Sequence, residues 1–202
     1  MLERIQLAVW LVSLKLSYKL KSMITEINGR KIKILIESSE ISKKVSELGK
    51  TITQDYKDKD LIIIGVLKGS FIFLADLIRH IEIKAEIDFV RVSSYKEGTE
   101  AGEIELITDI EASLKGRDVL LVEDLVDTGG TLDFIRENIL SKNPASYKTC
   151  ALVKKKKRRE TDITVDYVGF EIDDKFIVGY GTDLAEKGRN IPDIFTIEKE
   201  DG

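Results

Sequence analysis

An acidic segment directly after an apolar strand constrains this chain more than any other feature. Residues 119–132 read VLLVEDLVDTGGTL, so an apolar run leads into Glu123 and Asp124 and then into Asp127. Carboxylates at the end of a buried strand are costly unless water, a metal ion or a ligand solvates them. The Thr-Gly-Gly-Thr that follows precedes a helical pattern, where backbone N–H groups can converge on an anion. One loop therefore offers carboxylates for hydroxyl groups or a metal ion, and amides for a phosphate.

The length and composition are those of one globular domain with a sizeable core. The 202 residues are 43% apolar and 34% charged, and the net charge of −4 does not favour nucleic acid. Cys150 is the only cysteine, which excludes an internal disulfide and suits a reducing cytoplasm; we expect it on a core strand. The single histidine, His80, excludes a histidine triad or a multi-histidine metal site, and we interpret it as structural.

The N-terminal segment stands apart from the rest of the chain. Residues 5–14 are apolar but fall short of the roughly 20 residues of a membrane span, so no membrane association is expected. No small-residue cleavage site follows Lys15, which argues against a signal peptide. Our hypothesis is that residues 1–22 are an N-terminal extension of uncertain role and that residues 23–202 form the functional domain.

Strand and helix patterns alternate along the remaining sequence. The expected strands are residues 61–66, 83–92, 116–122, 147–153, 165–170 and 176–180. The expected helices are residues 38–54, capped by Ser38 or Ser39, then 71–81 and 132–140. The run 61–66 is wholly apolar, which is typical of a strand buried on both faces. The alternation predicts an α/β fold with a parallel twisted sheet flanked by helices.

Three loops that follow expected strands carry polar chemistry, and ligands of such sheets bind beyond the carboxyl ends of the strands. These loops are residues 67–70, residues 123–131 and the segment from Lys154 onward. Neither a Walker A motif nor a dinucleotide-binding fingerprint occurs, so the common nucleotide-binding loops are excluded.

Residues 122–132 resemble the phosphoribosyl-diphosphate (PRPP) binding motif of the type I phosphoribosyltransferases. Further segments resemble the bacterial hypoxanthine-guanine phosphoribosyltransferases, in the order of that family: residues 66–70, 93–95, 168–172, 174–180 and 189–190. The resemblance implies the type I fold, with a small hood built from both ends of the chain. It also implies purine salvage, in which the 5-phosphoribosyl group passes from PRPP to N9 of hypoxanthine or guanine and pyrophosphate leaves.

The same resemblance assigns the donor-binding residues. Glu123 and Asp124 would face the ribose hydroxyls and hold Mg²⁺, with help from Asp183, and Asp127 would be the general acid/base at purine N7. The 5′-phosphate would be held by Asp127, Thr128, Gly129, Gly130 and Thr131. Many relatives carry a longer side chain at the position of Gly130.

Pyrophosphate and the base would be held by other loops. Lys68, Gly69 and Arg189 match the pyrophosphate-binding residues, and in the family the peptide before that lysine is often cis. Lys154 matches the lysine that reads the purine 6-oxo group, which is sound chemistry because an ammonium only donates hydrogen bonds. The remaining assignments are Phe176 stacking on the base, Ile177 bonding its edge, Asp183 near the guanine amino group, and Ser94 and Tyr95 opening a mobile loop.

Two alternatives stay open beside this reading. The first is transfer to another base such as xanthine, because side chains decide the purine 2-position poorly. The second is a regulatory protein on the same fold that binds RNA through the basic run 154–159. We interpret residues 155–159 as a solvated face and separate Lys154 from them. Relatives are dimers or tetramers, so a cytoplasmic homodimer or homotetramer is expected.

Removal of residues 1–22 should leave a soluble and active protein, because the residues that carry the resemblance all follow this segment. The measurement is the yield of soluble protein and the rate of pyrophosphate release from PRPP for the full and the shortened chain. An insoluble or inactive product would contradict the domain boundary.

Overall fold

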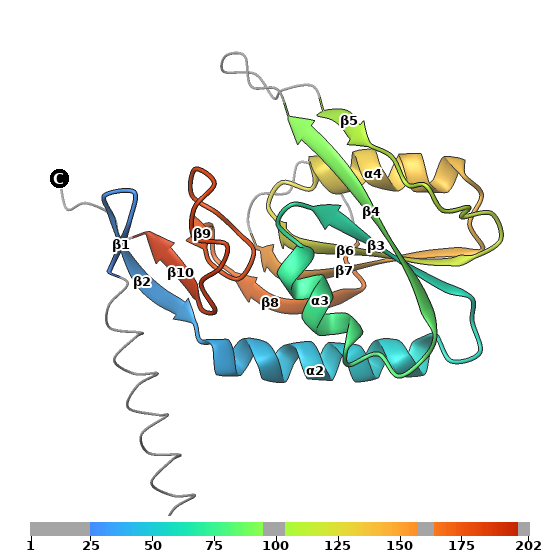
Figure 1. Ribbon diagram of the computed structural model, residues 1–202, viewed down its shortest axis with the longest axis horizontal. Helices are drawn as coiled ribbons and strands as arrows, with labels where there is room; N and C mark the ends of the chain where they lie inside the picture. The colour runs from blue at the N-terminus through green and yellow to red at the C-terminus, as the bar shows by residue number, and fades with distance from the viewer. Residues whose placement is uncertain (1–24, 95–103, 157–163, 198–202) are drawn as a thin grey trace, which may run out of the picture.

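The computed structural model describes residues 25–94, 104–156 and 164–197 (Figure 1). The proposed extension 1–22, Tyr95 and the basic residues 157–159 lie outside the described residues. The elements are β1 (Glu26–Ile27), β2 (Arg30–Ile36), α2 (Ser38–Asp55), β3 (Leu61–Leu67), α3 (Phe71–Ile78), β4 (Ala85–Ser94), β5 (Ile104–Thr108), β6 (Asp118–Val126), α4 (Gly130–Ser141), β7 (Ser146–Lys155), β8 (Tyr167–Ile172), β9 (Ile177–Val178) and β10 (Ile194–Ile197).

The main sheet has the strand order β5-β4-β3-β6-β7-β8. Strands β4, β3, β6, β7 and β8 are parallel, and only the edge strand β5 runs antiparallel to its neighbour. Helices α2 and α3 pack on one face of this sheet and α4 packs on the other (Figure 1). The predicted α/β fold with a parallel sheet between helices is confirmed.

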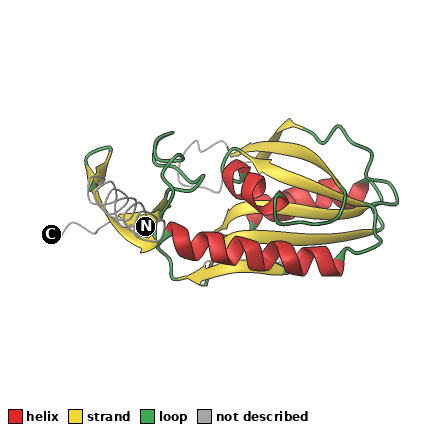
Figure 2. Cartoon of the chain, turned by 60° about the horizontal axis from the view of Figure 1, so that its bottom comes forward, coloured by secondary structure: helices red, strands yellow, loops and turns green. Residues whose placement is uncertain are grey.

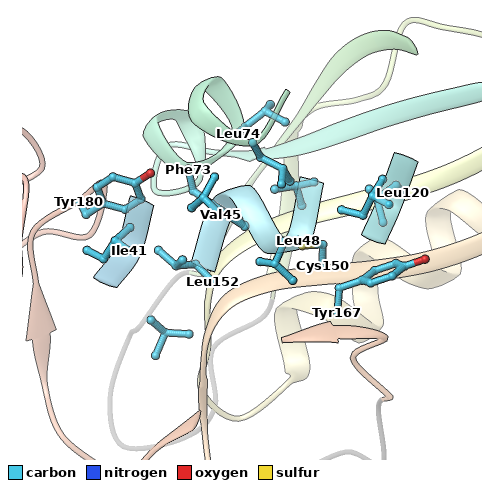
Figure 3. Close-up of a cluster of buried hydrophobic side chains, with 14 of the residues drawn as sticks. Ile41, Val45, Leu48, Phe73, Leu74, Leu120, Cys150, Leu152, Tyr167 and Tyr180 are labelled. Atoms are coloured by element: carbon cyan, nitrogen blue, oxygen red, sulfur yellow. The ribbon is translucent and has the colours of Figure 1, made fainter. Parts of the chain in front are cut away.

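Strand β3 is apolar throughout because both of its faces are covered. Leu61 and Ile63 belong to the cluster under α2 and α3, whereas Ile62 and Ile64 belong to the cluster under α4. Figure 3 shows the first cluster, in which α2 places a row of side chains against α3 and the sheet. Cys150 lies fully buried in this cluster, which confirms it as a core residue, and burial raises the pKa of its thiol.

A smaller sheet forms the hood, with the order β1-β2-β10-β9. It joins residues 26–36 to residues 177–197, so that both ends of the described chain contribute, as expected. Its own small core contains Ile27, Ile32, Val178, Ile191 and Phe195. Figure 2 shows the hood sheet set apart from the main sheet along the length of the molecule.

Helix α2 confirms the predicted span to within one residue, but the prediction of a serine cap is wrong. The N-cap is Glu37, whose backbone N–H donates to the Glu40 carboxylate over 3.1 Å in a capping box. The backbone N–H of Ser38 donates instead to Asp193 Oδ1 over 2.6 Å. A carboxylate of the hood therefore satisfies the first turn of a helix of the main domain.

Each predicted strand differs from the structure at one end or both, and two of these ends bear on the site. Strand β6 runs on to Val126, because it keeps its pairing with β7 after its last contact with β3, where Gly65 lies opposite Val122. Strand β9 ends at Val178 rather than at residue 180. The φ angles of Gly179, Tyr180 and Gly181 are 112°, 46° and 102°, which turn the backbone out of an extended path.

None of the helices in the described residues has both the length and the apolarity that crossing a bilayer requires.

Candidate active site

The candidate site lies where the loop after β3 packs between β6 and the hood segment 179–193. Gly69, in the loop after β3, packs directly on the Asp124 carboxylate, with which an added Cβ would collide. A Cβ on Gly181 would in turn collide with the carbonyl oxygen of Gly69. Only glycine fits at these two positions, and their close approach brings three segments that are distant in sequence into one site. The peptide bond between Leu67 and Lys68 is cis, as the resemblance implied.

Glu123 and Asp124 lie inside β6 and are 9% and 8% exposed. Burial raises the pKa of Glu123 well above its ordinary value, and the neighbouring Asp124 charge and its hydrogen bond to Glu123 add to the effect. Burial also raises the pKa of Asp124, against the hydrogen bond from Glu123, backbone donors and the charge of Arg189. Glu123 Oε2 is buried without a hydrogen-bond partner in the described part of the chain. This pair is suited to a cation or to hydroxyl donors.

The structure does not bring the three predicted metal ligands together. Among the described residues no group of three His, Cys, Asp or Glu side chains converges on one point. Asp183 pairs instead with Arg189 Nη2 at 2.7 Å and accepts the Glu186 backbone N–H at 2.8 Å. Glu123 and Asp124 can supply two oxygen ligands, and Mg²⁺ commonly takes its others from water and substrate oxygens.

The first turn of α4 forms the candidate phosphate cradle. Gly129 is the N-cap residue with a φ of 95°, a conformation that side chains rarely adopt, and no side chain caps the helix. The first backbone N–H groups of a helix have no partners within it and favour an anion. Thr128 and Thr131 flank this turn, and Thr128 Oγ1 accepts the Gly130 N–H at 3.5 Å. A Cβ at Gly130 would find its nearest atoms 3.9 Å away, so a longer side chain has room there.

Lys155 is the residue that the sequence interpretation misplaced. It was expected on a solvated face, but it is 6% exposed and its ammonium lies 2.8 Å from Asp127 Oδ2. The same ammonium lies 3.3 Å from Asp174 Oδ1. That expectation is wrong, because the parallel register pairs Val126 with Lys154 and so sets the next residues, Asp127 and Lys155, side by side.

Lys154 pairs with a different carboxylate. Its ammonium lies 3.4 Å from Glu171 Oε1 of β8, in a different direction from that of Lys155. Successive residues of a strand point to opposite faces, so only one of two adjacent lysines can enter the site. Six basic residues follow one another here, so the sequence alone does not show which lysine points toward Asp127. The pairing register of β6 and β7 would have shown it.

Two further residues predicted to bind the base, Phe176 and Ile177, lie just before β9 and at its start. Phe176 is 49% exposed, and an exposed aromatic side chain can stack on a planar ligand. Its carbonyl oxygen accepts the Thr196 hydroxyl at 3.0 Å. Ile177 is 3% exposed, so it can offer a ligand only its backbone. Ser94 is the last residue of β4.

The two predicted pyrophosphate cations meet at one carboxylate. Lys68 Nζ lies 3.0 Å from Glu186 Oε2, and Arg189 Nη2 lies 3.4 Å from the same oxygen. Arg189 Nη1 donates to the carbonyl oxygen of Gly181 over 2.9 Å. The structure therefore brings Lys68, Gly69 and Arg189 into one region, and it adds Glu186, which the sequence interpretation missed.

The chain matches the family model of the phosphoribosyl transferase domain over residues 32–184. It is similar to the hypoxanthine-guanine phosphoribosyltransferase of Aquifex aeolicus, with 43% identity over 175 residues that cover 86% of this chain and 98% of that protein. It is also similar to the hypoxanthine phosphoribosyltransferase of Escherichia coli, with 40% identity over 164 residues that cover 80% of this chain and 92% of that protein. A crystal structure of a hypoxanthine-guanine phosphoribosyltransferase from Bacillus anthracis aligns with a TM-score of 0.79 and 44% identity, covering 82% of this chain and 98% of that chain.

Replacing Glu123 by Gln should raise the melting temperature near neutral pH. The folded-state pKa of Glu123 is raised above its ordinary 4.5, so the folded protein binds this proton more tightly than the unfolded chain does. The free energy of unfolding therefore falls as the pH rises above about 4.5, and Gln removes that loss. We expect a rise of about 2–4 °C, equivalent to about 1 kcal/mol, which shrinks as the solution is acidified.

The measurement is thermal unfolding at a series of pH values, with Glu137→Gln on the exposed side of α4 as the matched control. A lower melting temperature for Glu123→Gln than for the unaltered chain at neutral pH would contradict the raised pKa of this carboxylate.

Proposed function

The chain belongs to the phosphoribosyl transferase family, and we propose that it transfers the 5-phosphoribosyl group of PRPP to N9 of hypoxanthine or guanine. The products would be the purine nucleotide and pyrophosphate, so the chain would act in purine salvage. The observation that carries the proposal is the meeting of three kinds of group at one edge of the sheet. These are the buried acids of β6, the open first turn of α4 and the cations Lys68 and Arg189.

The donor would bind across these three groups. Residues 127–131 would hold the 5′-phosphate through the N–H groups at the start of α4 and the hydroxyls of Thr128 and Thr131. The ribose hydroxyls would face Glu123 and Asp124, where Glu123 Oε2 has no hydrogen-bond partner among the described residues. Lys68, the backbone of Gly69 and Arg189 would hold the diphosphate, whose negative charge grows as the bond to the anomeric carbon breaks.

Mg²⁺ fits this arrangement, because two adjacent buried carboxylates have raised pKa values that a divalent cation would lower. Glu123 and Asp124 would hold it, and Asp183 would need to leave Arg189 to join them. When bound, the ion would orient the diphosphate and stabilise its developing charge.

The purine would be read by Lys155 rather than by Lys154. The Lys155 ammonium lies beside Asp127, so one buried cation can donate both to the purine 6-oxo group and to the carboxylate that exchanges a proton at N7. An ammonium cannot accept a hydrogen bond from the 6-amino group of adenine. The site would therefore prefer purines that carry an oxygen at position 6. Phe176 would stack on the ring, and the backbone of Ile177 would bond its edge.

Several finer points belong to the same proposal. The relatives carry hypoxanthine or hypoxanthine-guanine in their names, which supports these bases over xanthine. A homodimer or homotetramer in the cytoplasm remains our proposal for assembly and location. The burial of Lys155 removes one residue from the basic surface that RNA binding would need, which counts against that alternative.

Release of pyrophosphate from PRPP with hypoxanthine and Mg²⁺ tests the function. The unaltered chain should turn over, and Asp127→Asn should lower kcat by about 10²–10⁴-fold while the protein stays folded. Asp60→Asn, an exposed aspartate paired with Arg117 away from the site, is the matched control and should keep its rate. Absence of turnover with hypoxanthine, guanine and xanthine would refute the proposed function.

The neighbouring lysines offer a second, paired test. Lys155→Met should raise the KM for hypoxanthine by about 10–100-fold, because a buried charged donor to the base is lost. Lys154→Met should change it by no more than about twofold, since this side chain pairs with Glu171. Circular dichroism of both variants checks that they fold. A larger effect at Lys154 than at Lys155 would return the base-reading role to Lys154.

A further inference from the structure

Glu186 is a carboxylate at the candidate pyrophosphate site, and its negative charge opposes that of the proposed ligand. Its Oε2 atom lies 3.0 Å from Lys68 Nζ and 3.4 Å from Arg189 Nη2. Lys68 follows β3 and Arg189 belongs to the hood segment, so this carboxylate bridges the two cations across the site. The hydrogen bond from Lys68, followed by that from Arg189, holds the pKa of Glu186 below its usual range, so the bridge is ionic.

Glu186 is presented by a turn that its sequence does not favour. Leu184 and Lys187 exchange backbone hydrogen bonds of 2.9 and 3.3 Å, which leaves Ala185 and Glu186 as the two central residues. Their φ angles are 51° and 63°. Two-residue turns with positive φ at both centres favour asparagine and glycine, and neither residue here is of that kind.

Neighbouring side chains hold this turn in place. Asp183 Oδ2 accepts the Glu186 backbone N–H at 2.8 Å, and Asn28 Nδ2 donates to the carbonyl oxygen of Leu184 over 2.8 Å. Backbone strain that surrounding contacts enforce is concentrated at functional positions in proteins. The turn thus holds the Glu186 carboxylate in place beside Lys68 and Arg189.

The acceptors of the described residues do not satisfy every N–H group of Arg189. Its side chain is 20% exposed and fixed by Gly181 and Asp183, yet its Nε atom is buried without a hydrogen-bond partner among the described residues. An anion with several oxygens satisfies such a guanidinium better than one exposed carboxylate does. Pyrophosphate can therefore supply more acceptor oxygens to the two cations than Glu186 can.

We propose that Glu186 is a positioning residue that competes with pyrophosphate for Lys68 and Arg189 and so weakens the binding of this product. The inference rests on the proposed function and deepens it. Glu186 holds both cations in place between turnovers, and the diphosphate of the donor displaces it. When pyrophosphate is to leave, the carboxylate returns to the cations and lowers the cost of separating them from the product.

The test is calorimetric binding of magnesium pyrophosphate to the full chain and to Glu186→Gln. Loss of the competing charge should tighten pyrophosphate binding by about threefold to tenfold, the range that two exposed ion pairs can supply. The KM for PRPP should fall in parallel, while the KM for hypoxanthine should not change. Glu47→Gln, which removes an exposed ion pair with Lys44 on α2, is the matched control and should bind like the unaltered chain.

Two further variants separate the effect of the Glu186 charge from the effect of the backbone conformation of its turn. Ala185→Gly relaxes the turn but keeps the carboxylate, so pyrophosphate binding should not change. Glu186→Gly removes both charge and strain and should tighten binding as Glu186→Gln does. The inference is overturned if Glu186→Gln binds pyrophosphate no more tightly than the unaltered chain, or if only the glycine variants do. Absence of phosphoribosyl transfer by the unaltered chain would instead refute the proposed function.

Discussion

The placement of two adjacent carboxylates inside a buried strand is the constraint on which the rest of the site depends. Glu123 and Asp124 stand where β6 has lost its contact with β3 but still pairs with β7. The loop after β3 then crosses over Asp124, and only a residue without a side chain can make that crossing. The same contact stacks the hood segment on the loop through Gly181. The acids and the two glycines therefore form one unit.

Carboxylates of the chain itself already hold the cations that the proposed substrates would need. Lys155 lies against Asp127 and Asp174, Lys68 lies against Glu186, and Arg189 lies against Asp183. Binding of an anion or a base at these cations is then an exchange of partners rather than the capture of free charge. Such an exchange costs the cations little desolvation, because each is partly withdrawn from water before the ligand arrives. It also makes affinity a difference between two sets of contacts, which single residues can tune.

Local sequence patterns predicted the features of the fold and the candidate site that depend on residues close together in the sequence. The apolar run of β3, the helical spacing of α2 and the acid-to-glycine segment after β6 each carry their structure within a few residues. The predictions that were wrong, a solvated Lys155 and a serine cap on α2, depend on contacts between segments that are distant in sequence. The burial of Lys155 beside Asp127 is set by the register of β6 against β7, and one step of register exchanges the two faces. The cap of α2 failed likewise, because Asp193 bonds Ser38 from 155 positions away.

The hood contributes to the site through contacts outside its own small core. The segment that carries Phe176, Asp183, Glu186 and Arg189 is also tied to helices α3 and α2 of the main domain. Tyr180 donates its hydroxyl to Asp76 of α3 over 2.7 Å, and Asp193 accepts the first backbone N–H of α2 at 2.6 Å. Both helices pack on the same face of the main sheet, in the cluster that also receives Tyr180 and Ile194 (Figure 3). Because these anchors lie on either side of Glu186 and Arg189 in the sequence, the main core rather than the hood sheet fixes the position of that carboxylate and that guanidinium.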